Sequence, residues 1–502
     1  MADESSARST VTRRTFVAAL AAGTAGCGRF GSREGSQSTP TDTAWSTPTD
    51  DAEPTGTVTG TSTPDGRTVV WNVASHLDDG GPSAIRDALR EAGGLADGIT
   101  VRITEPTYDT VTRLSRLKQR LAGGESRPDL FTISYRDLPV LRDLGYLRPV
   151  SALAPDAARA ADSHLGPIRR ASESVDGDTL FGLPLFVDLP TVMYRRDLAE
   201  AAGYSPGTDG WATEPMSWRE WSQVIADVRD HAGVDYGFTT QWDRYIGTAC
   251  CSFNEVLSSW GGAYFGGRET LFGPVGQRPV TVDEAPVVES LRMMQRFVDG
   301  TSVEGFEGYA PDIAPAAVLD WTEEPSREPV AAGRAVAHRN WPYALRRMGG
   351  PDGPFGRDLG AMPLPYARAS SDAQAPAADG TTAALGGFVV AVNPHSDRHE
   401  AVRAVLDAMA EPAFLRFYAA FAGTFPPDLS LWADGLGSVP DRYLPTLRVA
   451  AENAVSQPAT RVWSRQARAV ADRANAAVAG EQSAAAAMAE LAETLSTIER
   501  EA

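Results

Sequence analysis

Lysine is almost missing from this sequence, because Lys118 is the only one among 46 basic residues. Acidic residues outnumber the basic ones and leave a net charge of −19. Nucleic-acid phosphates require a basic stripe on the protein, so this composition argues against a nucleic-acid partner. The acidic, arginine-rich surface is typical of a halophilic protein kept soluble in high salt. A GC-rich genome that favours arginine codons explains the same bias, and both readings stay open.

Cysteine is also scarce, with three residues in 502: Cys27, Cys250 and Cys251. Adjacent cysteines form a disulfide only with strain, so the spacing excludes a disulfide framework. Free cysteine behaves as a small apolar side chain that is usually buried. We therefore expect Cys250 and Cys251 to be small, unbonded residues of the interior.

Long apolar runs are missing, and the one short run near the N-terminus is too short to span a bilayer. It occupies residues 16–25, directly after the pair Arg13-Arg14, and ends at Thr24-Ala25-Gly26-Cys27. Twin arginines mark an export route for folded proteins, and small residues before a cysteine are typical of lipoprotein processing. The sequence predicts a twin-arginine signal peptide over 1–27. Cys27 would then be acylated and would hold the protein on the extracellular face of the cytoplasmic membrane.

Residues 28–66 consist largely of Ser, Thr, Pro, Gly and Asp. A segment so poor in apolar residues cannot build a core, which predicts a disordered tether. The chain from Arg67 onward is too long for one hydrophobic core and indicates two lobes.

Strand and helix patterns alternate after the tether. Residues 68–74, 99–103 and 129–133 form apolar strand-like runs, and amphipathic helical stretches lie between them, ending at glycine pairs. This alternation predicts an α/β fold with a mostly parallel sheet. Such sheets bind ligands beyond the carboxyl ends of their strands.

Helices dominate the second half of the pattern. Ser217 and Glu220 have the spacing of a capping box and predict a helix start, and residues 284–298 read as a further helix. The alanine-rich C-terminus predicts two helices separated by Gly480. Met488, Leu491, Leu495 and Ile498 form the packing stripe of the last helix, which is too short for a coiled coil.

Four pairs of segments carry a resemblance to a known family. They are 128–131 (PDLF) with 144–149 (LGYLRP), 182–188 (GLPLFVD) with 193–198 (MYRRDL), 332–337 (AGRAVA) with 339–344 (RNWPYA), and 385–388 (LGGF) with 391–393 (AVN). In this order and spacing, the chain from about 67 to 498 resembles the extracellular solute-binding proteins of ABC importers, especially the maltose/trehalose type.

The resemblance implies a two-lobe periplasmic-binding-protein-like fold of type II, in which crossing strands form a hinge beside a ligand cleft. We expect lobe 1 to comprise 67–187 and 389–428, and lobe 2 to comprise 188–388 and 429–502. The resemblance further implies a monomer that binds a small molecule, in particular a sugar or oligosaccharide, and needs no cofactor. The protein would deliver this ligand to permease subunits in the membrane.

Sugar recognition combines aromatic rings, which stack on apolar ring faces, with carboxylates, amides and arginines that satisfy hydroxyls. At positions matching the family's cleft, this chain offers a set of candidate ligand-binding residues: Ser134, Tyr135, Asp188, Gln241, Trp242, Tyr245, Trp341, Tyr343, Gly386, Gly387, Phe388, Arg461 and Trp463.

Each candidate also has an ordinary structural explanation. Trp341 and Tyr343 are the main stacking candidates, although aromatic residues often serve only as core. Asp188 is either a cleft carboxylate or a surface acid at a strand end. Gly386 and Gly387 either admit a ligand to the backbone or give the hinge its dihedral freedom. The chain departs from the related branch at two positions, since that branch often has an acid where Ser134 stands and Glu where Ile246 stands. Arg461 and Trp463 could instead pack between the lobes.

Catalytic motifs are missing from the sequence. It contains neither a phosphate-binding Gly-x-x-x-x-Gly-Lys loop nor a Gly-x-Ser-x-Gly elbow. His395 and His399 are the only close histidines, and two ligands are fewer than a metal site usually needs. We therefore expect a protein that is not an enzyme and holds no metal. The alternatives are a secreted lipoprotein that hydrolyses glycans, and a surface sensor with the same cleft fold.

Overall fold

The computed structural model describes residues 67–73, 80–104, 110–300, 303–367, 380–433, 435–437 and 439–502. All of them fall in a single compact unit of the chain. The twin arginines Arg13 and Arg14, the acylation candidate Cys27 and the tether over 28–66 lie outside the described residues.

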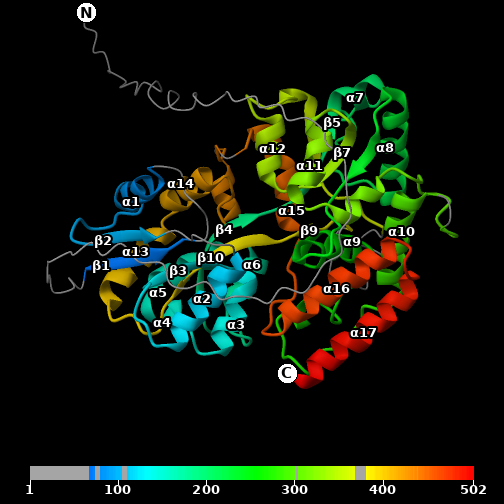
Figure 1. The fold of residues 1–502 in the computed structure, drawn as a ribbon. Helices are drawn as coiled ribbons and strands as arrows, with labels where there is room; N and C mark the ends of the chain where they lie inside the picture. Colours follow the sequence, from blue (N-terminus) through cyan, green and yellow to red (C-terminus); the bar gives the residue numbers. More distant parts are fainter. Residues whose placement is uncertain are drawn as a thin grey trace, which may run out of the picture. The chain divides into compact units, whose positions relative to one another are not determined.

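A five-stranded sheet carries the first part of the chain, in the order β2-β1-β3-β10-β4 (Figure 1). Its strands are β1 (Thr68–Asn72), β2 (Thr100–Thr104), β3 (Leu130–Ser134), β4 (Gly182–Asp188) and β10 (Gly386–Val392). β1 runs parallel to β2 and β3, and β10 runs antiparallel to β3 and β4. The three predicted N-terminal strands are confirmed to within two residues at each end.

Helices cover both faces of this sheet, as the strand–helix alternation predicts. On one face, α1 (Gly81–Glu91), α4 (Val150–Leu153), α5 (Pro155–Ala160), α13 (His399–Ala410) and α14 (Pro412–Ala422) share an apolar core with β1. On the other face lie α2 (Thr110–Ala122), α3 (Leu138–Asp143) and α6 (Gly166–Ser172). Figure 1 shows α1 and α14 on the opposite side of the strands from α2 and α3.

A second sheet has four strands in the order β6-β7-β5-β8. They are β5 (Thr191–Arg195), β6 (Tyr236–Thr239), β7 (Ala335–Asn340) and β8 (Leu359–Met362); β5 runs antiparallel to β7 and β8, and β6 runs parallel to β7. Its helices are α7 (Arg196–Ala201), α8 (Trp218–Ala232), α9 (Phe253–Ser259), α10 (Ala285–Asp299), α11 (Glu323–Ala331), α12 (Pro342–Gly349) and α15 (Leu444–Glu452).

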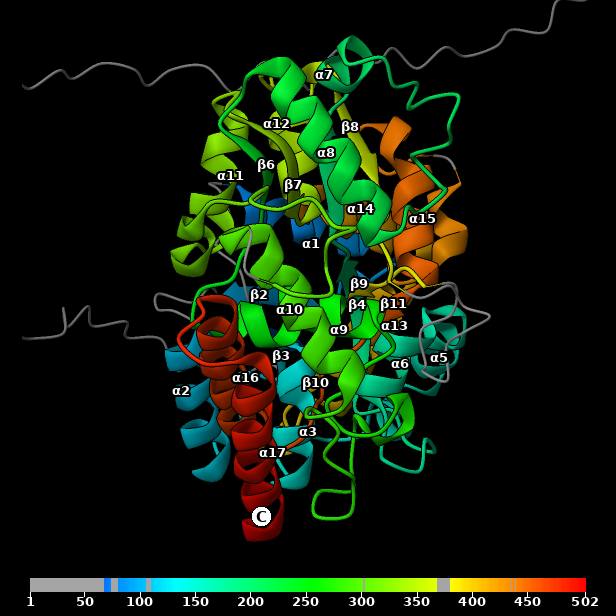
Figure 2. The same ribbon diagram turned by 90° about the vertical axis from the view of Figure 1, so that its right-hand side faces the viewer.

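Two long helices end the chain, α16 (Trp463–Val478) and α17 (Ala484–Glu501), and Figure 2 shows them side by side, near α10. Gly480, with φ +71°, separates them as predicted, and the stripe residues Met488, Leu491 and Leu495 are buried in the core of the second sheet. The predicted helix start is also confirmed, since Ser217 Oγ accepts a hydrogen bond from Glu220 N at 3.2 Å.

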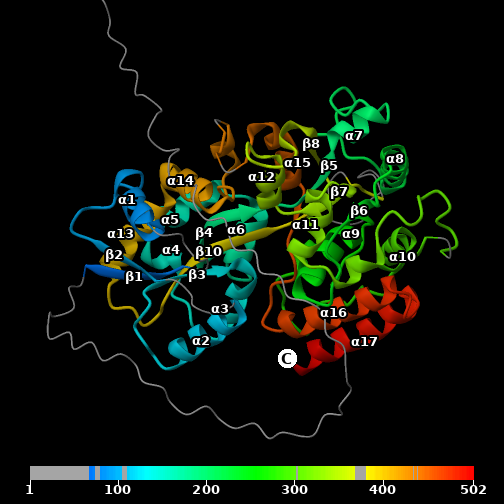
Figure 3. The ribbon, with the colours of Figure 1, turned by 45° about the horizontal axis from the view of Figure 1, so that its top comes forward.

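The chain passes between the two sheets at two neighbouring places. β4 leads into β5 through Leu189 and Pro190, and the short strand β9 (Ala383–Ala384) leads into β10 through Leu385. β9 itself pairs in parallel with β11 (Ala454–Val455). Figure 3 shows β4 and β10 together at the edge of the first sheet. Within the described part of the chain, no helix combines the length and the apolar character needed to cross a membrane.

Candidate ligand-binding site

The carboxyl end of β4 holds an acidic side chain with one buried oxygen that lacks a hydrogen-bond partner among the described residues. Asp188 pairs with Gly386 across the two crossing strands. Its Oδ1 atom is buried and has no hydrogen-bond partner among the described residues, although the residue as a whole is partly exposed. Burial raises the pKa of Asp188 to about 7, and the Leu189 backbone N–H and the charge of Arg339 offset only part of that effect. A hydrogen bond from a ligand hydroxyl would offset the free energy lost by burying this oxygen without a partner.

An indole ring lies next to that carboxyl group. Trp341 precedes α12, is half-buried, and contacts the guanidinium of Arg339, whose Cζ lies 5.0 Å from the ring centroid. A Cβ on Gly386 would lie 3.0 Å from Trp341 Cζ3 and 3.1 Å from Asp188 Cβ. A side chain at position 386 would therefore be crowded by both residues. The edge of the indole and the Cβ of Asp188 lie against the same glycine.

Arg339 is held by an ion pair that the sequence analysis missed. Its Nη2 and Nε donate to Glu255 Oε1 and Oε2 at 2.5 and 2.8 Å, and Nη1 donates to Gln241 Oε1 at 2.9 Å. The side chains of Arg339 and Glu255 are 3% and 1% exposed. Burial lowers the pKa of Arg339, but the adjacent Glu255 outweighs it and the pKa is raised. Glu255 also accepts from Ala384 N at 3.0 Å, which links α9, β7 and β9.

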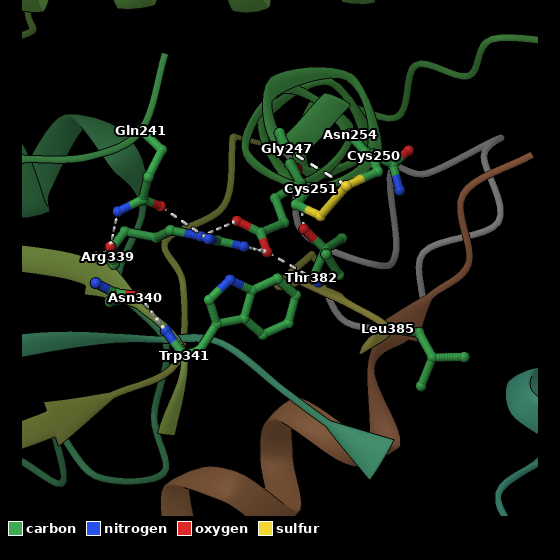
Figure 4. Close-up of polar contacts among 12 residues, drawn as sticks. Gln241, Gly247, Cys250, Cys251, Asn254, Arg339, Asn340, Trp341, Thr382 and Leu385 are labelled. Carbon is green, nitrogen blue, oxygen red and sulfur yellow. Dashed lines mark hydrogen bonds and ion pairs between the residues drawn. A yellow bond between two sulfur atoms is a disulfide. The ribbon is translucent and has the colours of Figure 1, made fainter. Parts of the chain in front are cut away.

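Gln241 belongs to this support and offers nothing to a ligand. It is fully buried, and its Nε2 donates to Ser326 Oγ at 2.6 Å and to the Arg339 carbonyl at 2.9 Å. Both ends of the amide are therefore used within the protein (Figure 4). Gln241 and Arg339 are far apart in the sequence, so no local sequence pattern indicates that they are in contact.

Two of the predicted ligand contacts are wrong on grounds of burial. Trp242 is 0% exposed and Trp463 is 1% exposed, both inside the core of the second sheet. Trp242 Nε1 donates to the Ala474 carbonyl at 3.4 Å, and Trp463 Nε1 donates to Gln457 Oε1 at 2.7 Å. Neither ring has a free face. Arg461, next to Trp463, is exposed and contacts the C-terminal residue Ala502.

Tyr135 and Gly387 lie on the other side of the crossing. Tyr135 is 1% exposed and its hydroxyl donates to the Leu385 carbonyl at 2.7 Å, which ties the end of β3 to the crossing segment. A Cβ on Gly387 would lie 2.7 Å from Ile168 Cδ1 and 2.8 Å from the Phe186 carbonyl oxygen. These two residues therefore serve packing at the crossing in this structure.

The remaining candidates retain some exposure. Ser134 ends β3, and its Oγ accepts from Arg136 N at 3.4 Å. Phe388 stacks on Phe186 with ring centroids 5.1 Å apart. Tyr245 donates to Glu323 Oε1 at 3.0 Å, and burial followed by the Glu323 charge raises its pKa.

Tyr343 lines an open cavity of about 550 Å³ together with Arg347 and the end of α14. Asn340 Nδ2 donates to its hydroxyl at 3.4 Å, and Arg347 lies 5.5 Å from the ring centroid. Tyr343 is thus only two residues from Trp341 in sequence but lines a different surface.

Cys250 and Cys251 form a disulfide, so the prediction of two unbonded cysteines is wrong. Their burial is confirmed, since each is 7% exposed. Both lie in a π-helical turn, Thr248–Ser252, and form a small apolar cluster with Ala384 and Trp341. Figure 4 shows the sulfur pair beside the indole. Tertiary packing brings both sulfur atoms into one apolar pocket, and adjacency in sequence does not reveal such a pocket.

No metal-binding cluster of three or more His, Cys, Asp or Glu residues occurs in the described ranges. His395 Nε2 interacts with the Leu121 carbonyl at 3.0 Å, and His399 begins α13. The arrangement at Trp341 and Asp188 suits recognition of a hydroxylated ring rather than coordination of an ion.

The two sheets and the crossing segments between them define a two-lobed α/β protein. Residues 83–414 match the model of the bacterial extracellular solute-binding protein family, and the chain belongs to that family. A protein of Deinococcus radiodurans named "Probable ABC transporter-binding protein" is 26% identical over 381 residues, which cover 75% of this chain and 80% of that protein.

Solved structures show the same fold. Maltose-bound MalE3 of T. maritima superposes with a TM-score of 0.64 at 21% identity, covering 85% of this chain and 98% of that one. MalE of Xanthomonas citri, a sugar-binding protein, gives 0.65 at 19% identity, covering 86% and 98%. The GacH receptor of Streptomyces glaucescens, solved unliganded and with acarbose, gives 0.63 at 17% identity, covering 86% and 98%. The fold is the type II periplasmic-binding-protein fold.

Proposed function

We propose that this protein is the solute-binding component of an ABC importer, and that it captures a sugar or oligosaccharide between two lobes and delivers it to the permease. Its relative's name supports the transporter assignment, and the sugars bound by structural neighbours support the ligand class. The observation that carries the proposal in this chain is that the half-buried Trp341 and Asp188, whose Oδ1 is unpaired among the described residues, both lie against Gly386.

The recognition mechanism follows from these two groups. Trp341 offers an apolar, electron-rich face on which the C–H side of a sugar ring stacks. Asp188 then forms a hydrogen bond with a hydroxyl group of the sugar, which offsets the free-energy cost of desolvating its buried oxygen. Arg339, bonded to Glu255 and Gln241, holds the indole from the protein side. Closing the lobes (67–187 with 389–428, and 188–388 with 429–502) around the crossing would complete the enclosure of the ligand.

A ligand panel tests the proposal. Isothermal titration of the purified protein with maltose, acarbose, α-D-tagatose and ribitol should give micromolar binding of at least one sugar, about 8 kcal/mol of binding free energy. Analysis of the same samples for cleavage products separates binding from the alternative of a glycan hydrolase, since turnover overturns the proposal. Uptake of the bound sugar by membranes containing the cognate permease separates an importer component from a surface sensor.

The membrane attachment is a proposal from sequence. Arg13-Arg14 and Cys27 support export by the twin-arginine route followed by acylation, which would keep the binding protein near its permease. Cell fractionation of a Cys27→Ser protein should move it from the membrane to the medium. Retention in the membrane of that variant would contradict the anchor.

A further inference from the structure

The disulfide belongs to an apolar cluster that includes the proposed stacking residue. Cys250, Cys251 and Ala384 are buried together, and the half-buried Trp341 packs against them. This cluster is separate from the three large cores of the described chain. Figure 4 shows the sulfur pair beside the indole, with Arg339 on another side. The disulfide therefore forms part of the wall that supports Trp341.

The turn that carries the disulfide is itself held in place. Thr248 Oγ1 donates to the Asp243 carbonyl at 2.5 Å, and the buried Tyr264 hydroxyl donates to the Ala249 carbonyl at 2.7 Å. Both bonds hold the first two residues of the turn, and its last residue, Ser252, leads directly into α9. The backbone of the turn therefore has little room to shift, and a change at the sulfur atoms is taken up mainly by the side chains packed against them.

Other contacts of Trp341 in the described part of the chain involve Asn340, Arg339 and Gly386. Trp341 N donates to Asn340 Oδ1 at 2.7 Å, which holds the backbone and leaves the ring free to turn. Arg339 Cζ lies 5.0 Å from the centroid of the ring, and Gly386 lies against the ring at the crossing. The remaining support comes from the cluster of Ala384 and the disulfide.

We propose that the Cys250–Cys251 disulfide positions Trp341 for stacking on the ligand, so that its reduction to two thiols weakens sugar binding. The inference rests on the proposed function. A dithiol reductant supplies two electrons and two protons, the S–S bond breaks, two S–H bonds form, and the reductant becomes a disulfide. The separated sulfur atoms need more room than the bonded pair, and a packed site accommodates added volume only by displacing neighbours. Outside the cell the oxidised form persists.

The first measurement compares the two redox states. The full chain with Cys27→Ser, so that only these two cysteines react, is titrated with maltose, acarbose, α-D-tagatose and ribitol before and after treatment with dithiothreitol. Mass spectrometry of alkylated protein confirms which state is present. We expect the reduced protein to bind with a Kd about tenfold higher. The melting temperature without ligand should stay nearly unchanged.

A double-mutant cycle shows whether the effect passes through the indole. In Trp341→Ala, reduction should leave Kd unchanged, because the positioned ring is gone. Cys250→Ala with Cys251→Ala removes both sulfur atoms and the support that they give the ring, so it should also weaken binding and should not respond to dithiothreitol. These results together support a positioning role for the disulfide.

Four results would overturn the inference. Equal Kd values for the oxidised and reduced forms leave the proposed function intact and exclude the redox effect. A tenfold loss that persists in Trp341→Ala shows that the disulfide acts elsewhere. A large fall in melting temperature on reduction shows that the disulfide stabilises the whole fold and does not act specifically on Trp341. Absence of binding to every sugar in the oxidised protein removes the proposed function and this inference with it.

Discussion

Two buried arginine–glutamate pairs, Arg339–Glu255 and Arg278–Glu499, share the same chemistry but not the same surroundings. Each is almost fully buried, and each arginine also lies against an aromatic ring. Arg278 lies 3.7 Å from the centroid of Phe265, which is completely buried. Arg339 lies 5.0 Å from the centroid of Trp341, which is half-buried. One ring is enclosed by protein, and the other keeps part of its surface exposed.

The carboxylate of Glu499 accepts more hydrogen bonds than the carboxylate of Glu255. Glu499 accepts from Arg278, from Gln466 Nε2 at 2.6 Å and from Gly276 N at 2.7 Å, and although burial acts to raise its pKa, these donors lower it. Burial raises the pKa of Glu255, and Arg339 and Ala384 N offset only part of this. Glu499 is thus the more fully hydrogen-bonded carboxylate, whereas Glu255 keeps a raised pKa, which is a perturbation typical of functional sites.

The largest effects should come from removing the negative charge of each pair. Glu499→Gln and Glu255→Gln each leave a buried arginine without its counter-ion, and we expect each to lower the free energy of unfolding by about 3–5 kcal/mol. Denaturant titration measures this loss. Only Glu255→Gln should also weaken sugar binding by the folded protein. Weaker binding in Glu499→Gln, measured below its unfolding transition, would erase the contrast between the pairs.

Removing the rings should separate affinity from stability. Trp341→Ala should raise the Kd about 10- to 100-fold, or about 1.4–2.8 kcal/mol, with little change in melting temperature. The matched variant Phe265→Ala should lose about 3–5 kcal/mol of stability, because it leaves a cavity in the core. Calorimetric titration and thermal unfolding of both variants measure the two quantities. A Trp341→Ala protein that loses stability but binds normally would show that this indole serves only in packing.

The raised pKa of Asp188 predicts a pH-dependent stability. Its folded-state pKa is about 7 against a usual value of 3.8, so the folded protein binds the proton more tightly than the unfolded chain. This contribution is complete below about pH 3.8 and is lost as the pH rises towards 7. The difference in unfolding free energy between wild type and Asp188→Asn should therefore shrink or change sign across this window. A difference independent of pH would contradict the raised pKa.

The smallest effect is expected at Tyr245. Its hydroxyl donates to Glu323 at 3.0 Å, and Tyr245→Phe removes this bond while keeping the ring. Loss of one such bond should cost about 1 kcal/mol of stability. Titration with the same sugar should show at most a threefold change in Kd. A larger loss of affinity would place the hydroxyl in contact with the ligand.

Much of the fold could be predicted because its signals are local. Apolar runs, glycine stops and the Ser217 cap define strands and helices through neighbouring residues, and the stripe on α17 is buried as its spacing predicts. Trp341 and Asp188, which the family resemblance assigns to the cleft one by one, both lie against Gly386. Glu255 and Gln241 were not assigned to Arg339, because contacts between residues 84 and 98 positions apart leave no local pattern.

The sequence by itself determined the α/β class, the order of the crossing segments and the family. Each depends on periodicity or on residues close together in the chain. Only the tertiary structure decided which aromatic rings are enclosed, as for Trp242 and Trp463, and which keep a free surface, as for Trp341. It also decided that Cys250 and Cys251 are bonded. The physical reason is common to both results: exposure and pairing depend on what packs against a side chain from distant segments.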